Sequence, residues 1–374
     1  MLPRVVDAVE RVTARAADGD ELLEGVAAEV RKAVPYDGGM WFGVDPTTLL
    51  AVAPARMEAL DAGYCNTFWF GEFHEQDANL FADLARDPSP AGTLRTATDE
   101  RPMRSARYRD FLRPQGYDDE LRVVFRTGAR SWGAAGLFRA AGRDPFDEHD
   151  VAVLEAISPI VAAAFRTHAA LAVPNPGFAQ APGLLLFDRD GAILSANEAA
   201  SSWLAEIYGA DADTDWFELL AGLHTPDLGA AIPIIPLIAR AHAVANGRDA
   251  REARLRLRDR SGRWLVLHAS VLEGRDGDGN VAVVVEPAKS GDVAPIIIEA
   301  YGLTVRERDV VKAIARGRST PEIAAELFLS SHTVRDYIKA VFDKVGVSSR
   351  GELVAKLFAE HYSEPFHETL VDVH

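Results

Sequence analysis

Near the C-terminus, side chains able to hydrogen-bond to nucleic acid recur at helical spacing. Val334, Ile338 and Val341 fall on one stripe of a 3.6-residue period, so residues 331–345 are predicted to form a helix with one buried face. The opposite face would meet solvent, and its chemistry is that of a DNA contact. The candidate DNA-binding residues, including those on the flank of the helix, are Ser331, His332, Thr333, Val334, Arg335, Tyr337, Lys339 and Lys344.

The cations of this helix suit two kinds of contact with DNA. Arg335 is the candidate base reader, because its planar guanidinium can bond guanine O6 and N7 together. Lys339 and Lys344 suit phosphate contacts, since a flexible ammonium acts as a point charge. Asp336 and Asp343 lie on the same predicted face and make it less basic. We therefore expect the DNA affinity of this helix to depend on pairing of two chains.

Capping signals predict four short helices that would hold the reading helix in place. Thr304 with Glu307 and Ser349 with Glu352 have the spacing of capping boxes. A tight turn between the second and third helices makes a helix-turn-helix module at residues 303–360. The remaining signals are a stop at Gly317, a cap at Thr320 with Pro321 at the first helical position, a turn at Phe328 and Leu329, a cap at Ser330 and a stop at Gly346.

Four segments of this module resemble the LuxR/NarL type of helix-turn-helix domain. The resemblance implies DNA binding as a dimer, with Thr333, Val334 and Lys344 near the DNA backbone and the third helix reading bases. Tyr337 and Pro321 depart from the residues common in that type, although Tyr337 keeps a hydroxyl donor. The segments are LT-x-R-E at Leu303–Glu307, G-x-x-x-x-EIA at Gly317–Ala324, L-x-x-S-x-x-TV at Leu327–Val334 and K-x-GV-x-x-R-x-EL at Lys344–Leu353.

The 374 residues are enough for two or three domains, and their charge is uneven. Residues 303–358 hold 10 Lys/Arg and 7 Asp/Glu, a net charge of +3. Because the whole chain carries −16, the remaining residues carry −19. A mildly basic end on an acidic body suits a DNA reader attached to a larger regulatory part. One cysteine, no signal-peptide pattern and no long apolar run indicate a cytoplasmic protein without a membrane segment.

Residues 1–170 resemble a GAF domain in the order of their predicted elements. Two helices precede a strand at Met40–Val44, and a hairpin follows at Leu121–Gly128 and Trp132–Arg139. A long helix capped by Asp147 closes the domain. We expect an antiparallel sheet flanked by helices.

A second sheet domain is predicted after a linker at residues 171–183. Strands at Leu184–Phe187 and Ala192–Ser195, followed by an Asn197-capped helix, resemble the opening of a PAS domain, which would cover residues 184–287. Residues 288–302 would connect it to the helix-turn-helix module, and residues 361–374 would be a tail. The predicted fold class is α+β, with two antiparallel-sheet sensor domains before an all-α four-helix module.

Aromatic residues in the first domain are the candidate small-molecule site. Such walls are typical of ligand pockets, but the same residues are also typical of a plain core. Cys65 has no adjacent His or basic residue and indicates a buried structural thiol. His224 and the Asp276–Asn280 loop fit a haem or calcium site poorly, so no cofactor or metal is identified. The candidate pocket residues are Trp41, Tyr64, Phe68, Trp69 and Phe70.

These patterns favour a transcriptional regulator that binds promoter or operator DNA as a homodimer. Its DNA binding would be gated by an unknown small-molecule effector or a partner acting on the sensor domains. An enzyme is disfavoured because the sequence has no Ser/His/Asp set, metal motif or phosphate loop. The remaining alternative is a scaffold that uses the terminal module for protein docking without a small-molecule ligand.

Overall fold

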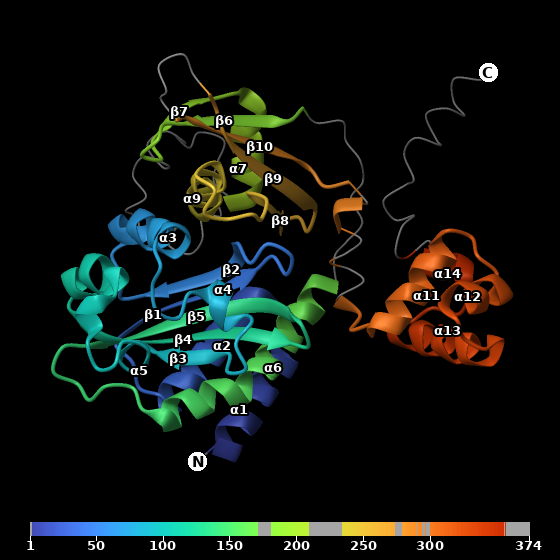
Figure 1. The fold of residues 1–374 in the computed structure, drawn as a ribbon, viewed down its shortest axis with the longest axis horizontal. Coiled ribbons are helices and arrows are strands. Elements are labelled where there is room, and N and C mark those ends of the chain that lie inside the picture. The colour runs from blue at the N-terminus through green and yellow to red at the C-terminus, as the bar shows by residue number, and fades with distance from the viewer. Residues whose placement is uncertain are drawn as a thin grey trace. The chain divides into compact units, whose positions relative to one another are not determined.

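The computed structural model describes residues 2–170, 181–208, 234–273, 279–289, 291–293, 296, 300–354 and 356. The chain forms two compact units, Met1–Phe165 with Gln180–Pro287, and Arg166–Ala179 with Ala288–His374. Figure 1 shows the first unit as two sheets with helices and the second as a small helical group. The features considered at His224, Asp276 and Asp278, and most of the linker, lie outside the described residues.

The first sheet is antiparallel, with strand order β2-β1-β5-β4-β3. Strands β4 and β5 form its long central hairpin, which turns at Gly128 with φ +61°. Strand β2 was not foreseen, because Pro54 breaks its pattern; proline is tolerated there since β2 is an edge strand. The strands are β1 Gly38–Val44, β2 Ala51–Glu58, β3 Ala91–Thr93, β4 Tyr117–Thr127 and β5 Arg130–Ala140.

Helices cover both faces of this sheet (Figure 1). Helices α1, α2 and α6 lie on one face, where Ser158 of α6 donates a hydrogen bond to the carbonyl of Val124 at 2.8 Å. Helix α3 and the shorter helices cover the other face around an aromatic core that includes Phe68, Phe81 and Phe138. The longer helices are α1 Leu2–Arg15, α2 Gly19–Ala33, α3 Cys65–His74 and α6 Glu148–Ala170, and the shorter ones are α4 Phe81–Leu84, α5 Leu94–Ala97, and the single turns at Ala62–Tyr64, Pro102–Arg104, Tyr108–Leu112 and Arg113–Gln115.

Helix α6 is apolar enough to be compared with a membrane span. By length and composition its residues Glu148–Ala169 would suffice, the only such helix in the described ranges. Its inward face is, however, occupied by the first sheet, since Leu154, Ile157 and Val161 are fully buried. We therefore interpret α6 as the core helix of the first sheet.

The second sheet is also antiparallel, with strand order β7-β6-β10-β9-β8. Helices α7 and α9 pack on one of its faces around Phe187, Trp203 and Leu237. Asn197 caps α7 as predicted, because its Oδ1 accepts from the Ala200 N–H at 2.9 Å. The two sheets confirm the predicted α+β class. The elements are β6 Gly183–Phe187, β7 Ile193–Ala196, α7 Glu198–Tyr208, α9 Ile234–Ala245, β8 Arg254–Arg258, β9 Trp264–Val271 and β10 Val281–Pro287.

A buried ion pair fastens the two sheets to each other. The Arg256 guanidinium donates to both carboxylate oxygens of Asp45, at 3.1 and 2.9 Å, and the Arg256 N–H donates to the same carboxylate at 3.0 Å. Asp45 is 1% exposed and Arg256 is 8% exposed. Leu50 and Val52 of the first sheet's segment also lie in the core of the second. The sheets therefore share an interior and form one unit.

Replacing Arg256 with alanine should destabilise this unit strongly. The substitution leaves the Asp45 carboxylate buried without its cation, and breaking a buried pair in this way costs about 3–5 kcal/mol. Thermal and urea unfolding would show the loss. Arg189→Ala is the matched control, because the Arg189–Asp190 pair is 75% and 81% exposed at 3.7 Å and should contribute under about 1 kcal/mol. Equal melting temperatures for the two variants would contradict the role given to Arg256.

Candidate nucleic-acid interface

The C-terminal unit contains the four predicted helices around a small core. Helices α12 and α13 are joined by a short turn in which Phe328 has φ +56°, so the predicted helix-turn-helix arrangement is confirmed. We call residues 303–354 the helical module. Its buried core includes Leu303, Val310, Ile314, Ile323, Val334, Ile338, Val341 and Leu353. The helices are α11 Val305–Ala315, α12 Thr320–Leu327, α13 Ser331–Val345 and α14 Arg350–Val354.

The first and third caps of the module are as predicted. Thr304 and Glu307 form a full capping box, with the Thr304 N–H donating to the Glu307 carboxylate at 2.6 Å. Ser330 caps α13, because its Oγ accepts from the Thr333 N–H at 3.1 Å. Gly346 ends α13 in the left-handed region at φ +68°. These bonds fix both ends of the predicted reading helix.

Two cap predictions need correction. Thr320 was expected to cap α12, but it is the first helical residue and Ser319 is the cap. The reason is that the Ser319 N–H and hydroxyl both bond the Glu322 carboxylate, at 2.8 and 2.6 Å. At α14, Ser349 accepts from the Glu352 N–H as predicted, but the Glu352 carboxylate bonds Ser348 instead, at 2.7 Å.

Helix α13 presents most of the predicted DNA-binding residues to solvent. His332, Arg335 and Lys339 are exposed, whereas Ser331, Thr333 and Tyr337 are partly buried. Val334 is 0% exposed, so its side chain belongs to the core and cannot contact a ligand. Val334 therefore sets the rotation of α13 about its axis, and a DNA contact at this position would have to be made by its main chain. The exposed side chains lie together on one face because α13 is a continuous helix.

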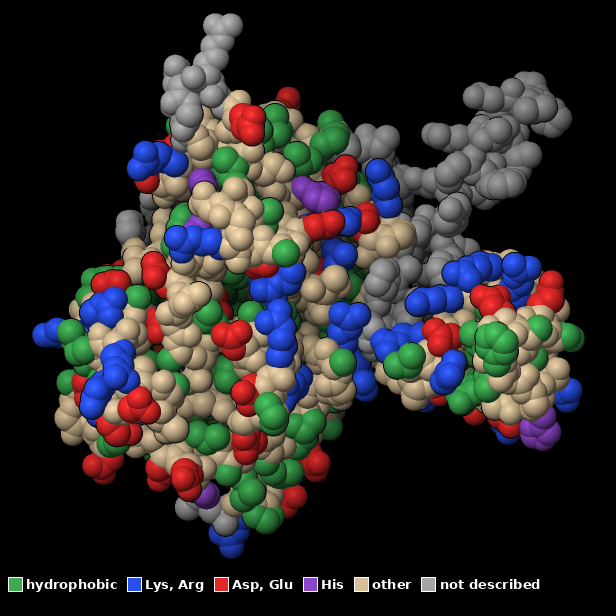
Figure 2. Space-filling view, viewed as in Figure 1, with side chains coloured by type: hydrophobic (Ala, Val, Ile, Leu, Met, Phe, Trp, Pro, Cys, Tyr) green, Lys and Arg blue, Asp and Glu red, His purple; other side chains and the backbone are tan. Residues whose placement is uncertain are grey.

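Within the described residues, Arg335 and Lys339 have no ion-pair or hydrogen-bond partner, so both cations are available to a ligand. His332 differs, because its Nδ1 lies 2.9 Å from the Asp336 carboxylate one turn later. Figure 2 shows basic and acidic side chains interspersed on the visible face of the helical module. The unpaired charge on α13 is therefore confined to a few side chains.

Lys344 holds the module together. Its Nζ lies 2.6 Å from the Glu307 carboxylate and 3.4 Å from the Gly302 carbonyl. Burial opposes ionisation of Glu307, but hydrogen bonds from Lys344 and Thr304 outweigh it and lower the pKa of this carboxyl below its ordinary value. This ion pair joins the C-terminal end of α13 to the start of α11. Lys344 would have to leave Glu307 in order to make the predicted phosphate contact.

Two further side chains of the module have properties that the sequence analysis did not describe. Arg350 donates to the Arg318 carbonyl at 2.8 Å and to the Thr320 hydroxyl at 2.7 Å, and so ties α14 to the start of α12. Phe328, in the turn before α13, is 94% exposed. Arg350 falls on the R of the K-x-GV-x-x-R-x-EL segment, which was the available signal for it. Nothing in the sequence indicated that Phe328 would be exposed rather than buried.

The candidate small-molecule residues of the first sheet do not come together. Trp41 stacks on Phe125 with ring centroids 6.0 Å apart, on the face of β1 opposite to the core that includes Phe42. Phe68, with Trp69 and Tyr64 beside it, belongs to the core on the opposite face. Phe70 instead lies 5.8 Å from the ring of His242. The structure therefore separates these five aromatics among three environments. Each of the three is packed by other side chains.

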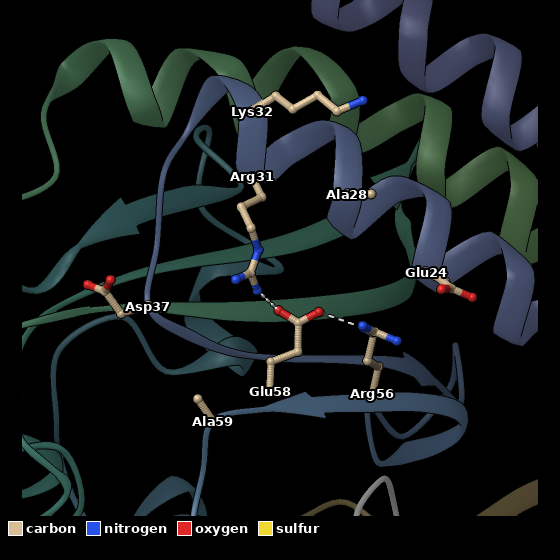
Figure 3. A pocket seen from close by; sticks show the side chains of 8 residues that line it. All are labelled: Glu24, Ala28, Arg31, Lys32, Asp37, Arg56, Glu58 and Ala59. Carbon is tan, nitrogen blue, oxygen red and sulfur yellow. Dashed lines mark hydrogen bonds and ion pairs between the residues drawn. The ribbon is translucent and has the colours of Figure 1, made fainter.

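A surface hollow does occur elsewhere in the first unit, between α2 and β2 (Figure 3). Most of its lining side chains are charged, and Glu58 forms ion pairs with both Arg31 and Arg56. Its charges are therefore largely neutralised within the protein. Cys65 lies outside this hollow, and burial together with the nearby Asp61 raises the pKa of its thiol to about 11, as expected of an unreactive cysteine. The hollow is lined by Glu24, Ala28, Arg31, Lys32, Asp37, Arg56, Glu58 and Ala59.

Comparison with known proteins gives specific matches for the helical module. Residues 302–357 match the GerE family, bacterial regulatory proteins of the luxR family. The spore germination protein GerE of Bacillus subtilis is 44% identical over 55 residues, which cover 15% of this chain and 74% of GerE. The probable transcriptional regulatory protein NarL of Mycobacterium tuberculosis is 40% identical over 68 residues, or 18% of this chain and 29% of NarL. The chain thus spans under a third of NarL.

A solved structure is similar to part of this chain at a low level. The GAF domain of a phosphoenolpyruvate-protein phosphotransferase from Coxiella burnetii covers 43% of this chain and 90% of that domain. Its TM-score is 0.30 and its sequence identity is 13%.

Glu307→Gln should weaken the helical module near neutral pH and have little effect in acid. The pKa of Glu307 is lowered on folding, so its contribution is present above the ordinary pKa of about 4.3 and is lost as the pH falls through the folded value. A charge-assisted hydrogen bond is worth about 1.5–3 kcal/mol. Calorimetry of the full chain between pH 3.5 and 7 would show the melting difference narrowing in acid. Asp343→Asn is the control, because Asp343 is exposed and has no ion-pair or hydrogen-bond partner within the described residues. A difference independent of pH would contradict this role.

Proposed function

Because the chain belongs to the LuxR family of bacterial regulatory proteins, we propose that it is a sequence-specific DNA-binding transcriptional regulator. The observation that carries the proposal is the exposed face of α13. Caps fix both ends of this helix, and Arg335 and Lys339 on its exposed face have no ion-pair or hydrogen-bond partner among the described residues. A helix of 15 residues is about 22 Å long and fits a major groove. Arg335 would read a base edge, and Lys339 would contact phosphate.

We further propose that two copies act together. Residues 303–358 have a net charge of only +3, and Asp336 and Asp343 lie on the face that would meet the DNA. One module would therefore bind weakly, whereas two on neighbouring half-sites would bind with the sum of their contacts.

The unit with two sheets is proposed to gate this binding, by sensing either a small molecule or a protein partner in the cytoplasm. Support comes from the shared interior around Asp45 and Arg256, which makes the two sheets respond as one body. An event in either sheet could then alter the spacing of two paired modules. A scaffold without a ligand would use the same surfaces, and native mass spectrometry of the purified chain would distinguish the two by a co-purifying small molecule.

Arg335→Ala and Lys339→Ala should weaken DNA binding in different ways. Loss of a bidentate base contact should cost about 1–3 kcal/mol on the preferred sequence and relax specificity at one base pair. Loss of a phosphate contact should weaken binding on all sequences and reduce the salt slope by about one. Binding would be measured across a salt series, on fragments selected from random DNA by the full chain. Lys312→Ala, an exposed lysine on α11, is the control and should leave both quantities unchanged.

Lys344→Ala gives a second check on the same assignment. Because Lys344 is paired with Glu307, its loss should lower the melting temperature of the module while leaving the salt slope close to that of the parent. Unchanged binding in both the Arg335 and Lys339 variants would rule out α13 as the reading helix. A lowered salt slope for Lys344→Ala would instead mean that Lys344 leaves Glu307 for a phosphate.

A further inference from the structure

The N-terminal half of α13 carries a bonded pair of polar side chains on the face that would meet DNA. Nδ1 of His332 lies 2.9 Å from Oδ2 of Asp336, which follows one helical turn later. The two side chains are 83% and 67% exposed, so the pair faces solvent and not the core of the helical module. A reading helix ordinarily contacts base edges through its N-terminal residues, and the pair begins at the second residue of α13.

The hydrogen bond within this pair fixes what it can offer to a base. A carboxylate oxygen only accepts hydrogen bonds, so Nδ1 of His332 carries the proton and donates it to Asp336. In a neutral imidazole the other ring nitrogen, Nε2, is then an acceptor, as is the second carboxylate oxygen, Oδ1. Neither atom bonds any residue that the structure describes. The neutral pair therefore presents two acceptors and no donor.

One base edge of the major groove complements two acceptors better than the others. Guanine presents N7 and O6 and thymine presents O4, and all of these atoms are acceptors that the pair would repel. Adenine has a donor at N6, but its N7 acceptor lies beside it. Cytosine presents the N4 amino donor and no acceptor, and a carboxylate that accepts from N4 is a recurrent base contact. The pair therefore fits cytosine.

Arg335 has the opposite hydrogen-bonding chemistry and lies next to this pair. It is three residues after His332 and is exposed, so the two side chains are neighbours on the helix surface. The guanidinium donors suit guanine O6 and N7, whereas the acceptors of the pair suit the cytosine amino group. An acid on this face repels the phosphates of every DNA sequence. The repulsion is offset by a hydrogen bond only where a cytosine lies opposite Asp336.

We propose that Asp336, oriented by His332, accepts a hydrogen bond from a cytosine amino group beside the guanine that Arg335 reads. The proposal rests on the DNA binding proposed for α13 and adds the base that the acidic part of its surface selects. Asp336 lowers the affinity of the module for DNA in general and raises its discrimination among sequences, because it both attracts one base edge and repels others.

Asp336→Ala in the full chain tests the proposal on a duplex that the parent chain has selected from a random pool. Each cytosine of this duplex is replaced in turn by 2-pyrimidinone, which pairs with guanine but lacks the 4-amino group. At the position that Asp336 contacts, the replacement should weaken binding of the parent at least about fivefold. The Asp336→Ala variant should bind the two duplexes equally, because it has no acceptor for the missing amino group.

Asp343→Ala is the matched control. Asp343 is also an exposed acid of α13, but it has no ion-pair or hydrogen-bond partner within the described residues. Both substitutions remove a negative charge near the phosphates, so both should tighten binding to non-selected DNA. Only Asp336→Ala should remove the sensitivity to 2-pyrimidinone. Circular dichroism would establish that both variants fold.

Asp336→Asn provides a second, independent readout. An asparagine amide bonds adenine N6 and N7 together, so selection with this variant should place adenine where the parent prefers cytosine. The proposal is overturned if this variant selects the same base as the parent, or if 2-pyrimidinone weakens the parent and Asp336→Ala equally at every position. If Arg335→Ala and Lys339→Ala weaken DNA binding as predicted while Asp336→Ala keeps the parent's sensitivity, the inference about cytosine fails and the proposed function stands.

Discussion

The orientation of α13 depends on a carboxylate that belongs to another helix. Glu307 closes the capping box of α11 and also accepts from Lys344 at 2.6 Å, so one side chain fixes the start of α11 and the end of α13. Arg350 makes the corresponding tie between α14 and α12. With both ends held, the buried Val334 determines which residues of α13 face outward. The chemistry available to DNA follows from these few internal bonds.

The same constraint explains which predictions for the module succeeded. Capping boxes are local, so T-x-x-E and the Ser330 cap could be predicted from spacing alone. The cap of α12 was predicted at Thr320 instead of Ser319 because the two residues are adjacent candidates. Only the position of Glu322, three residues after Ser319, decides between them. Val334 and Lys344 were assigned by resemblance, which does not report burial or internal pairing. Those properties arise from contacts between residues far apart in the sequence.

Upstream, the sequence predicted sheets better than it predicted the side chains packed between them. The strands at Met40–Val44 and Leu184–Phe187 follow from local pattern, and both are present. Trp41 and Phe68 looked like neighbours in one aromatic wall, but the residues of β1 alternate between the two sheet faces, and Trp41 points away from the core that holds Phe42 and Phe68. The pairing of Asp45 with Arg256 joins residues 211 positions apart, and no local signal could reveal it.

That pairing also bears on how such a chain can change over evolutionary time. Domains joined by a linker can ordinarily be exchanged among proteins, because each half buries its own polar groups. Here a fragment ending near the linker would take Asp45 without its arginine, and would leave Leu50 and Val52 without the interior that covers them. Recombination inside the first 287 residues is therefore penalised, whereas exchange of the helical module with its self-contained core is not. The chain is modular at one junction and indivisible at the other.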